Sequence, residues 1–299
     1  MKISIAPIQY FWEKQKVFDF YNELKDSPAD IVYLGETVCA KRREISLSDW
    51  LEIAEQLTAA GKEVVLSSLT LFEAESELAS LRHVVANGHY VVEANDMAAT
   101  QLLSGCNSFV IGPHINCYNR QTLEYLRGLG ATRWVSPYEL GAKTIHQLQQ
   151  SSPANMEVEV LAFGHLSLAF SARCYTARSH NIGKDDCGFI CRDYADGLPM
   201  YTQGNKPFLI FNGIQTQSAT TQNLVAQLPE LADLGVDIAR VMPQSQGTIE
   251  IVDIFHKVIN GKLQAEAALA ELQPHLLYES CNGYWYGQAG MAYVDRADL

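Results

Sequence analysis

Four cysteines in two separate parts of the chain are the side chains best suited to metal or redox chemistry. Cys174, Cys187 and Cys191 lie in RCYTARSHNIGKDDCGFICRD, with twelve and then three residues between them, and Cys39 lies much earlier, in YLGETVCAKRRE. Iron–sulfur clusters take four Cys ligands, and their spacing along a chain is variable. Structural zinc sites usually contain cysteine pairs two to four residues apart, and only Cys187 and Cys191 approach that spacing. The pattern favours an iron–sulfur cluster and leaves zinc or unrelated cysteines as alternatives.

Basic residues surround these cysteines in a chain that is otherwise acidic. A four-thiolate 4Fe-4S cluster is usually anionic, so cationic neighbours are expected beside it. The basic residues close in sequence to the four cysteines are Lys41, Arg42, Arg43, Arg173, Arg178 and Arg192. The remaining cysteines, Cys106, Cys117 and Cys281, lie in or near strand-like or aromatic segments and are expected to act as small packing residues.

Glu36 and two histidines are weaker candidates for a role at the same site. Glu36, in GETVC, could donate a proton, although a capping role is the commoner one for such a residue. His165 could contact a cluster or substrate, but a lone histidine there is more often a packing residue, and His180 could be a mixed ligand that a four-Cys set makes unnecessary. No Gly-x-Ser-x-Gly or His-Glu-x-x-His motif occurs, which leaves little support for proteolysis.

The first half of the chain alternates short apolar runs with amphipathic stretches, which predicts parallel strands covered by helices. The predicted strands are Lys2–Ile8, Ile31–Gly35, Glu63–Ser68, Tyr90–Glu93, Ser108–Ile111, Arg133–Val135, Glu157–Phe163 and Asp237–Met242. The predicted helices are Trp12–Leu24, Ser48–Ala60, Leu71–Ala86, Asp96–Leu103, Arg120–Leu129, Leu140–Gln149, Gln217–Leu234 and Ile249–Asn260. Eight such strands favour a closed TIM-type (βα)8 barrel. An open doubly wound sheet is the alternative, but QYFWEKQK after the first strand lacks the glycines of a dinucleotide loop.

A long segment interrupts the alternation after the seventh strand. It spans residues 171–215 and contains three of the four cysteines and a predicted hairpin, Leu198–Thr202 with Phe208–Asn212. We expect one barrel domain over residues 1–299, with 171–215 as an inserted cluster-binding segment. Because the loops after all strands of a βα barrel meet at one rim, Cys39 and Cys174 are predicted to converge there.

Composition narrows the classes of partner and location. The chain has 299 residues and a formal net charge of −12, which disfavours non-specific binding to nucleic acid or anionic membranes. No run of about 18 apolar residues predicts a membrane span, and the start of the chain lacks the pattern of a signal peptide. An odd number of cysteines, seven, argues against a disulfide framework. The sequence therefore predicts a cytoplasmic protein.

The segment Glu159–Ser179 resembles the signature of the collagenase-like peptidase family. In that family an acidic residue precedes a glycine, a cysteine and a Ser-Gly-Arg-Cys element. The matching residues here are Glu159, Gly164, Ser171, Arg173 and Cys174. Two positions depart from the family pattern: its histidine is Phe163 and its first cysteine is Ser167. A cluster built in the usual family way would therefore lack one ligand.

The combination of Cys39 with the C-x12-C-x3-C spacing and the C-terminal CNGYWYG resembles the members of this family that act in ubiquinone biosynthesis. That resemblance implies a 4Fe-4S cluster on Cys39, Cys174, Cys187 and Cys191. It also implies a heterodimer with the related protein UbiU. Together the two chains would hydroxylate the aromatic ring of ubiquinone precursors without O2. The resemblance suggests prephenate as the hydroxyl donor. The alternatives are a non-catalytic redox or structural partner of UbiU and a collagenase-like peptidase.

Overall fold

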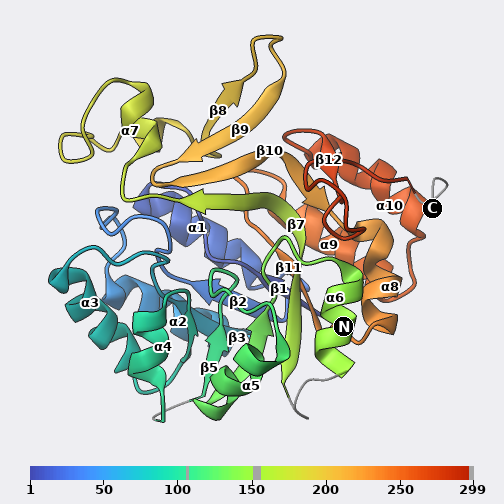
Figure 1. The fold of residues 1–299 in the computed structure, drawn as a ribbon, viewed down its shortest axis with the longest axis horizontal. Helices are drawn as coiled ribbons and strands as arrows, with labels where there is room; N and C mark the ends of the chain where they lie inside the picture. Colours follow the sequence, from blue (N-terminus) through green and yellow to red (C-terminus); the bar gives the residue numbers. More distant parts are fainter. Residues whose placement is uncertain (106–107, 151–155, 296–299) are drawn as a thin grey trace.

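A computed structural model describes residues 1–105, 108–150 and 156–295. Within them, eight parallel strands form a closed barrel in the order β11-β1-β2-β3-β4-β5-β6-β7, and β11 also pairs with β7 (Figure 1). This closure confirms the predicted TIM barrel over an open sheet. The barrel strands are β1 (Lys2–Ile5), β2 (Ile31–Leu34), β3 (Glu63–Ser67), β4 (Val91–Ala94), β5 (Phe109–Ile111), β6 (Ala131–Val135), β7 (Glu157–Phe170) and β11 (Ile238–Val241).

Helices follow the strands at the predicted places and cover the outside of the barrel (Figure 1). Several begin at polar caps: Ser46 and Asp49 form a capping box at α2, and Asn119 accepts the Thr122 N–H at α5. The helices between barrel strands are α1 (Lys14–Leu24), α2 (Leu47–Ala59), α3 (Glu75–Val85), α4 (Met97–Leu103), α5 (Arg120–Gly128), α6 (Ala142–Gln150) and α8 (Leu228–Asp233), and α9 (Thr248–Ile259) and α10 (Ala265–Leu272) follow β11.

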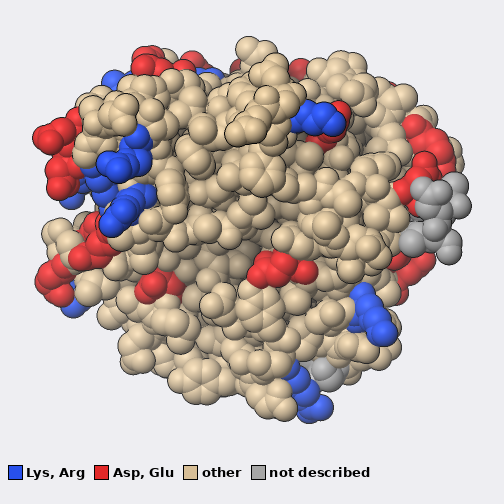
Figure 2. All heavy atoms as spheres, turned by 45° about the horizontal axis from the view of Figure 1, so that its top comes forward, with Lys and Arg blue, Asp and Glu red and all other residues tan. Residues whose placement is uncertain are grey.

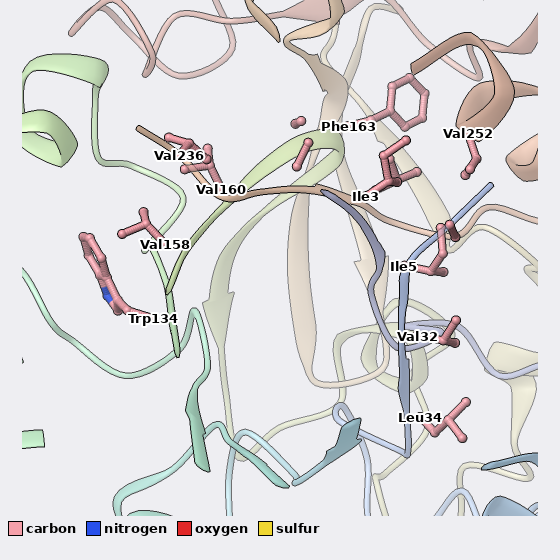
Figure 3. Packing of buried hydrophobic residues seen from close by; sticks show 14 of the residues in the cluster. Ile3, Ile5, Val32, Leu34, Trp134, Val158, Val160, Phe163, Val236 and Val252 are labelled. Carbon is pink, nitrogen blue, oxygen red and sulfur yellow. The ribbon is translucent and has the colours of Figure 1, made fainter. Parts of the chain in front are cut away.

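The two faces of each barrel strand pack into different layers because successive side chains point to opposite sides. Ile3 and Ile5 of β1 lie in the main apolar cluster between strands and helices, whereas Ser4 points inward. Figure 3 shows Ile3 and Phe163 directed towards Val252 of α9. A smaller apolar layer fills part of the interior and consists of Ile31, Tyr33, Val65, Val110, Val135 and Ile238.

A buried network of charged side chains occupies the barrel beside this apolar layer. Arg240 of β11 contacts Glu93 of β4 at 2.8 Å and Glu159 of β7 at 3.1 Å. Glu159 also accepts the Tyr33 hydroxyl at 2.6 Å, and Tyr33 accepts a bond from Arg133 at 3.2 Å. Each charge therefore meets an opposite charge or a hydrogen-bond partner, which buried ions require. The network links strands on opposite sides of the barrel.

The segment after β7 departs from the barrel pattern and from one prediction. It contains α7 (Tyr175–Ser179), η1 (Ile190–Asp193) and the antiparallel strands β8 (Leu198–Tyr201), β9 (Pro207–Asn212) and β10 (Gln215–Asn223). The predicted hairpin is confirmed, and it projects beyond the barrel (Figure 1). The predicted helix Gln217–Leu234 is wrong over its first half, because residues 215–223 pair with β7 and β9. Pairing on two sides outweighs the weak helical pattern of this Thr-rich segment.

The C-terminal part packs on the barrel. Trp285 is 3% exposed, and β12 (Ser280–Cys281) pairs with β10. The helix α10 was not predicted, and residues 296–299 lie outside the described residues. No helix in the described parts of the chain is both long and apolar enough to cross a membrane.

Arg240→Met is expected to destabilise the fold by about 3–5 kcal/mol, because it leaves Glu93 and Glu159 buried without their shared cation. Urea unfolding followed by circular dichroism measures this change. Arg82→Met is the control, since the Arg82–Glu75 pair on α3 is exposed and should contribute less than about 1 kcal/mol. Equal effects of the two substitutions would contradict a structural role for the network.

His114 is expected to make stability fall as the pH drops from about 6.5 towards 4. Its ring packs against Tyr138 and Phe170, and burial lowers the pKa of His114 to about 4. In this pH range the unfolded chain binds a proton that the folded chain does not, so acid favours unfolding. His114→Gln should remove up to about 2 kcal/mol of this pH dependence, whereas His89→Gln, at an exposed site, should preserve it. Parallel pH profiles for wild type and His114→Gln would refute the assignment.

Candidate metal centre

The four predicted cysteines meet around one small cavity at the carboxyl-terminal rim of the barrel. Cys39 comes from the loop after β2, and Cys174, Cys187 and Cys191 come from the segment after β7. Their thiols are close enough to interact electrostatically, Cys174 with each of the other three. The structure therefore brings together residues that lie 135 positions apart in the sequence.

The turn that presents Cys39 is held by Glu36. One carboxylate oxygen of Glu36 accepts the backbone N–H groups of Val38 at 2.8 Å and Cys39 at 3.0 Å. The Cys39 carbonyl accepts the Arg42 N–H at 2.9 Å and closes the turn. Of the two roles considered for Glu36, this geometry supports capping, because the carboxylate fixes the direction of the Cys39 side chain.

The other three cysteines lie in a compact loop with two short helical turns. The Cys174 sulfur accepts the Ala177 N–H at 3.4 Å at the start of α7. Gly188 and Phe189 both have positive φ, 55° and 57°, and reverse the chain between Cys187 and η1, which carries Cys191. These two reversals turn a C-x3-C pair towards the same cavity as Cys174.

Arg42 joins the segments that surround the cavity. Its buried guanidinium donates to the Gln9 carbonyl at 2.8 Å and to Asn212 Oδ1 at 2.7 Å, and it lies 3.8 Å from Glu36. Gly213, with φ of +63°, makes this contact possible, since a Cβ there would lie 2.9 Å from Arg42 Nη2. The loops after β1 and β2 and the β9–β10 turn are thereby fixed to one cation.

The other basic residues near the cysteines are mostly paired with acids or carbonyl groups. Lys41 contacts Asp185 at 2.7 Å, and Arg192 contacts Glu44 at 2.9 Å. Lys184, which the sequence reasoning did not single out, lines the cavity and pairs with Glu73. Figure 2 shows blue and red side chains interspersed on the left of its face, the side of α3 and α7 in Figure 1. Arg42 is thus a buried cation beside the four cysteines. The surface ion pairs of Lys41 and Arg192 link the loop after β2 to the segment after β7.

The sequence candidates other than the four cysteines are placed elsewhere or are already bonded. Both ring nitrogens of His180 have partners, the Thr176 carbonyl at 2.9 Å and the Tyr194 hydroxyl at 3.1 Å, so His180 is not a ligand. His165 lies within β7 rather than after it, buried against Tyr278. Its Nδ1 has no hydrogen-bond partner in the described chain.

The remaining cysteines and the family position Ser167 lie apart from the cavity. Cys117 and Cys281 are fully buried, as expected of packing residues, and Cys106 lies outside the described residues. Ser167 Oγ accepts a bond from Gln215 Nε2 at 3.1 Å between β7 and β10. In this chain Cys39, rather than the residue at position 167, faces the other three cysteines.

Burial affects the chemistry of the thiols. Burial raises the pKa of Cys39, Cys174 and Cys191, and Arg42 opposes this rise at Cys39 and Cys191. Raised thiol pKa values disfavour a free thiolate nucleophile at neutral pH. Within the described residues, no three His, Cys, Asp or Glu side chains come close enough to bind a single metal ion.

The fold and site define a TIM-barrel protein with a four-cysteine cavity at the carboxyl-terminal rim of its barrel. The chain belongs to Peptidase family U32, whose family model matches residues 18–291. It is similar to the U32 peptidase Mk0906, with 10% identity and a TM-score of 0.46 over 82% of this chain and 94% of that one. It is also similar to dihydropteroate synthase from Thermus thermophilus, with 11% identity and a TM-score of 0.39 over 85% and 94%. Membership rests on the family model, because such distant structural likeness carries no functional argument.

If the four cysteines bind iron, as the sequence predicts, Glu36→Ala is expected to weaken this binding by about 10-fold or more, because the Cys39 turn loses the acceptor for two N–H groups. Glu36→Gln keeps an acceptor oxygen and should bind iron nearly as well as wild type. Iron retained by anaerobically loaded protein against a graded chelator measures the difference. Equal losses in both variants would instead indicate that the charge of Glu36 is what matters.

Proposed function

We propose that the four cysteines hold a 4Fe-4S cluster and that the chain is the iron–sulfur subunit of an O2-independent hydroxylase. Its substrate would be the aromatic ring of ubiquinone precursors, and it would act in the cytoplasm as a heterodimer with UbiU. In this respect the chain resembles the ubiquinone biosynthesis protein UbiV. The observation that carries the proposal is the convergence of Cys39 with Cys174, Cys187 and Cys191 on one cavity.

The spacing of the cysteines along the chain supports a cluster over zinc. Structural zinc sites usually contain cysteine pairs two to four residues apart, and only Cys187 and Cys191 approach that spacing. The four thiols line one cavity although they come from two separate segments of the chain. A cubane cluster carries its four ligands at separate corners of a wider body. Membership of a family named for peptidases leaves this assignment open, because function depends on the site.

The surroundings of the cavity suit a redox group. A 4Fe-4S cluster, when bound, supplies one-electron transfer. Phe189 and Ile190 line the cavity with apolar surface and restrict water, while the positive charge of Arg42 acts on Cys191 and compensates negative charge. Hydrogen bonds to cluster sulfurs and restricted solvent both tune reduction potential. The side chains of this chain thus fix the ligands and set their electrostatic environment.

Exposed apolar residues near the cavity support a protein partner. Phe189, beside the cysteine loop, is 39% exposed, and Tyr201 and Phe208 of the projecting hairpin are 52% and 46% exposed. Leu168, on the part of β7 that extends past the barrel, is 40% exposed. Large apolar side chains grouped on one side of a protein often mark a contact surface. A UbiU-like chain is the partner that the proposal assigns to them.

Alanine at any of the four cysteines is expected to reduce cluster content, because a four-Cys cluster loses a ligand. Wild-type protein purified without oxygen should carry about four iron and about four sulfide per chain and show a broad visible absorption band. Cys39→Ala is the most informative variant, since its ligand comes from a different loop. Cys117→Ala and Cys281→Ala, at buried sites away from the cavity, should keep the cluster. Stoichiometric zinc, or full iron content in Cys39→Ala, would overturn the assignment.

The same variants separate a catalytic subunit from a non-catalytic partner. Wild type reconstituted with UbiU under anaerobic conditions should hydroxylate a ubiquinone precursor supplied with prephenate. A Cys174→Ala chain that folds and still binds UbiU should lose this activity. Full activity of that pair would establish the alternative, in which this chain only stabilises or senses redox state. Release of peptides from collagen by the wild type alone would establish the peptidase.

A further inference from the structure

Arg42 differs from the other buried arginines in the kind of group that it contacts. Arg133 and Arg240 are also buried among the described residues, and each contacts two carboxylates at 2.6 to 3.1 Å. Arg42 instead donates to the Gln9 carbonyl oxygen at 2.8 Å and to Asn212 Oδ1 at 2.7 Å. Both acceptors are neutral. The direct hydrogen bonds of Arg42 therefore leave its positive charge uncompensated.

The charge of Arg42 is balanced only weakly by the one carboxylate beside it. Glu36 and the thiols of Cys39 and Cys191 are the ionisable groups that act most strongly on Arg42. Glu36 Oε1 lies 3.8 Å from the guanidinium and already accepts the N–H groups of Val38 and Cys39. Since a buried cation needs negative charge close by, its position beside the cysteine cavity indicates an anionic centre there.

The orientation of the Asn212 amide is fixed by its other contacts. Asn212 Nδ2 donates to the Gln9 carbonyl at 2.7 Å and to Gln215 Oε1 at 2.9 Å, so Oδ1 is the atom that faces Arg42. Gln215 Nε2 in turn donates to Gln9 Oε1 and to Ser167 Oγ, both at 3.1 Å. Asn212, Gln9 and Gln215 are each 3% exposed or less. A reversal of the buried Asn212 amide would cost two hydrogen bonds and turn a donor towards a cation.

We propose that Asn212 is a positioning residue that holds Arg42 with a neutral acceptor, so that the charge of Arg42 raises the reduction potential of a cluster on the cysteines. A cluster that gains one electron becomes more negative, and an uncompensated cation beside it stabilises the reduced form. An arginine held by a carboxylate, as Arg240 is, would instead present a nearly neutral pair. The inference rests on the proposed function only for the presence of the cluster.

Changing one charge at each of two neighbours of Arg42 should move the potential in opposite directions. Asn212→Asp places a carboxylate on Arg42 and should lower the potential. Glu36→Gln removes a carboxylate, keeps an acceptor oxygen for the Cys39 turn and should raise the potential. In each case the ratio of reduced to oxidised cluster at a fixed potential should change by at least about 10-fold, which is about 59 mV for one electron. Redox titration of the anaerobically loaded chain at pH 8, followed by electron paramagnetic resonance, measures both shifts.

Asn205→Asp is the matched control, because Asn205 is exposed in the turn of the projecting hairpin and the variant adds the same charge there. It should change the ratio by less than about 2-fold, since solvent screens an exposed charge. Gln215→Glu replaces Asn212→Asp if that variant does not retain iron. It keeps an acceptor for Asn212 Nδ2 and should also lower the potential.

Opposite shifts would support the inference, because loosening of the site gives no reason for the two variants to differ in sign. Shifts in the same direction for Glu36→Gln and for the variant with an added carboxylate would overturn it. Potentials that match those of wild type and Asn205→Asp would overturn it as well.

The inference and the proposed function fail in different ways. Opposite shifts in a loaded chain that does not hydroxylate with UbiU would refute the function and keep the role of Asn212. Hydroxylation by the loaded wild type, without opposite shifts in the variants, would keep the function and refute the role of Asn212. A chain that binds zinc or no metal at the cysteines would overturn both.

Discussion

The pairing of β11 with β1 on one side and β7 on the other is the constraint on which the rest of the structure depends. It closes the sheet, so the loop after β2 and the segment after β7 share one rim. The same strand carries Arg240 into the interior, where it meets Glu93 and Glu159. Closure and charge pairing support each other, because only a closed barrel removes these charges from water and only paired charges are tolerated there.

At the rim, Arg42 joins the loops as Arg240 joins the strands inside the barrel. Its guanidinium bonds to the chain after β1 through Gln9 and to the β9–β10 turn through Asn212, and it lies beside Glu36 in its own loop. Elements far apart in the sequence are thus held against one cation that lines the cysteine cavity.

The chain belongs to Peptidase family U32, and the structure shows what the residues of the expected family signature do. Glu159 and Gly164, both in the matching signature, support the barrel. Glu159 belongs to the interior network, and a Cβ at Gly164 would lie 2.5 Å from Met242 Cβ. Ser167, which differs, hydrogen-bonds within the sheet, and Cys39 comes to the cavity from another loop. Glu159 and Gly164, which match the signature expected from the sequence, thus support the barrel, while Cys39 rather than residue 167 faces the other three cysteines.

Sequence alone determined the alternation of strands and helices, because periodicities of two and about 3.6 residues are local properties. Once a barrel was assumed, the sequence also determined which cysteines could meet at its rim. Only the tertiary structure decided that residues 215–223 form β10, since that strand depends on partners in β7 and β9. The bonded state of His180, the particular N–H groups that Glu36 caps and the contacts of Arg42 at the cysteine cavity were beyond the sequence. Each depends on contacts between segments distant in the chain or on turn geometry, and no periodic pattern encodes these.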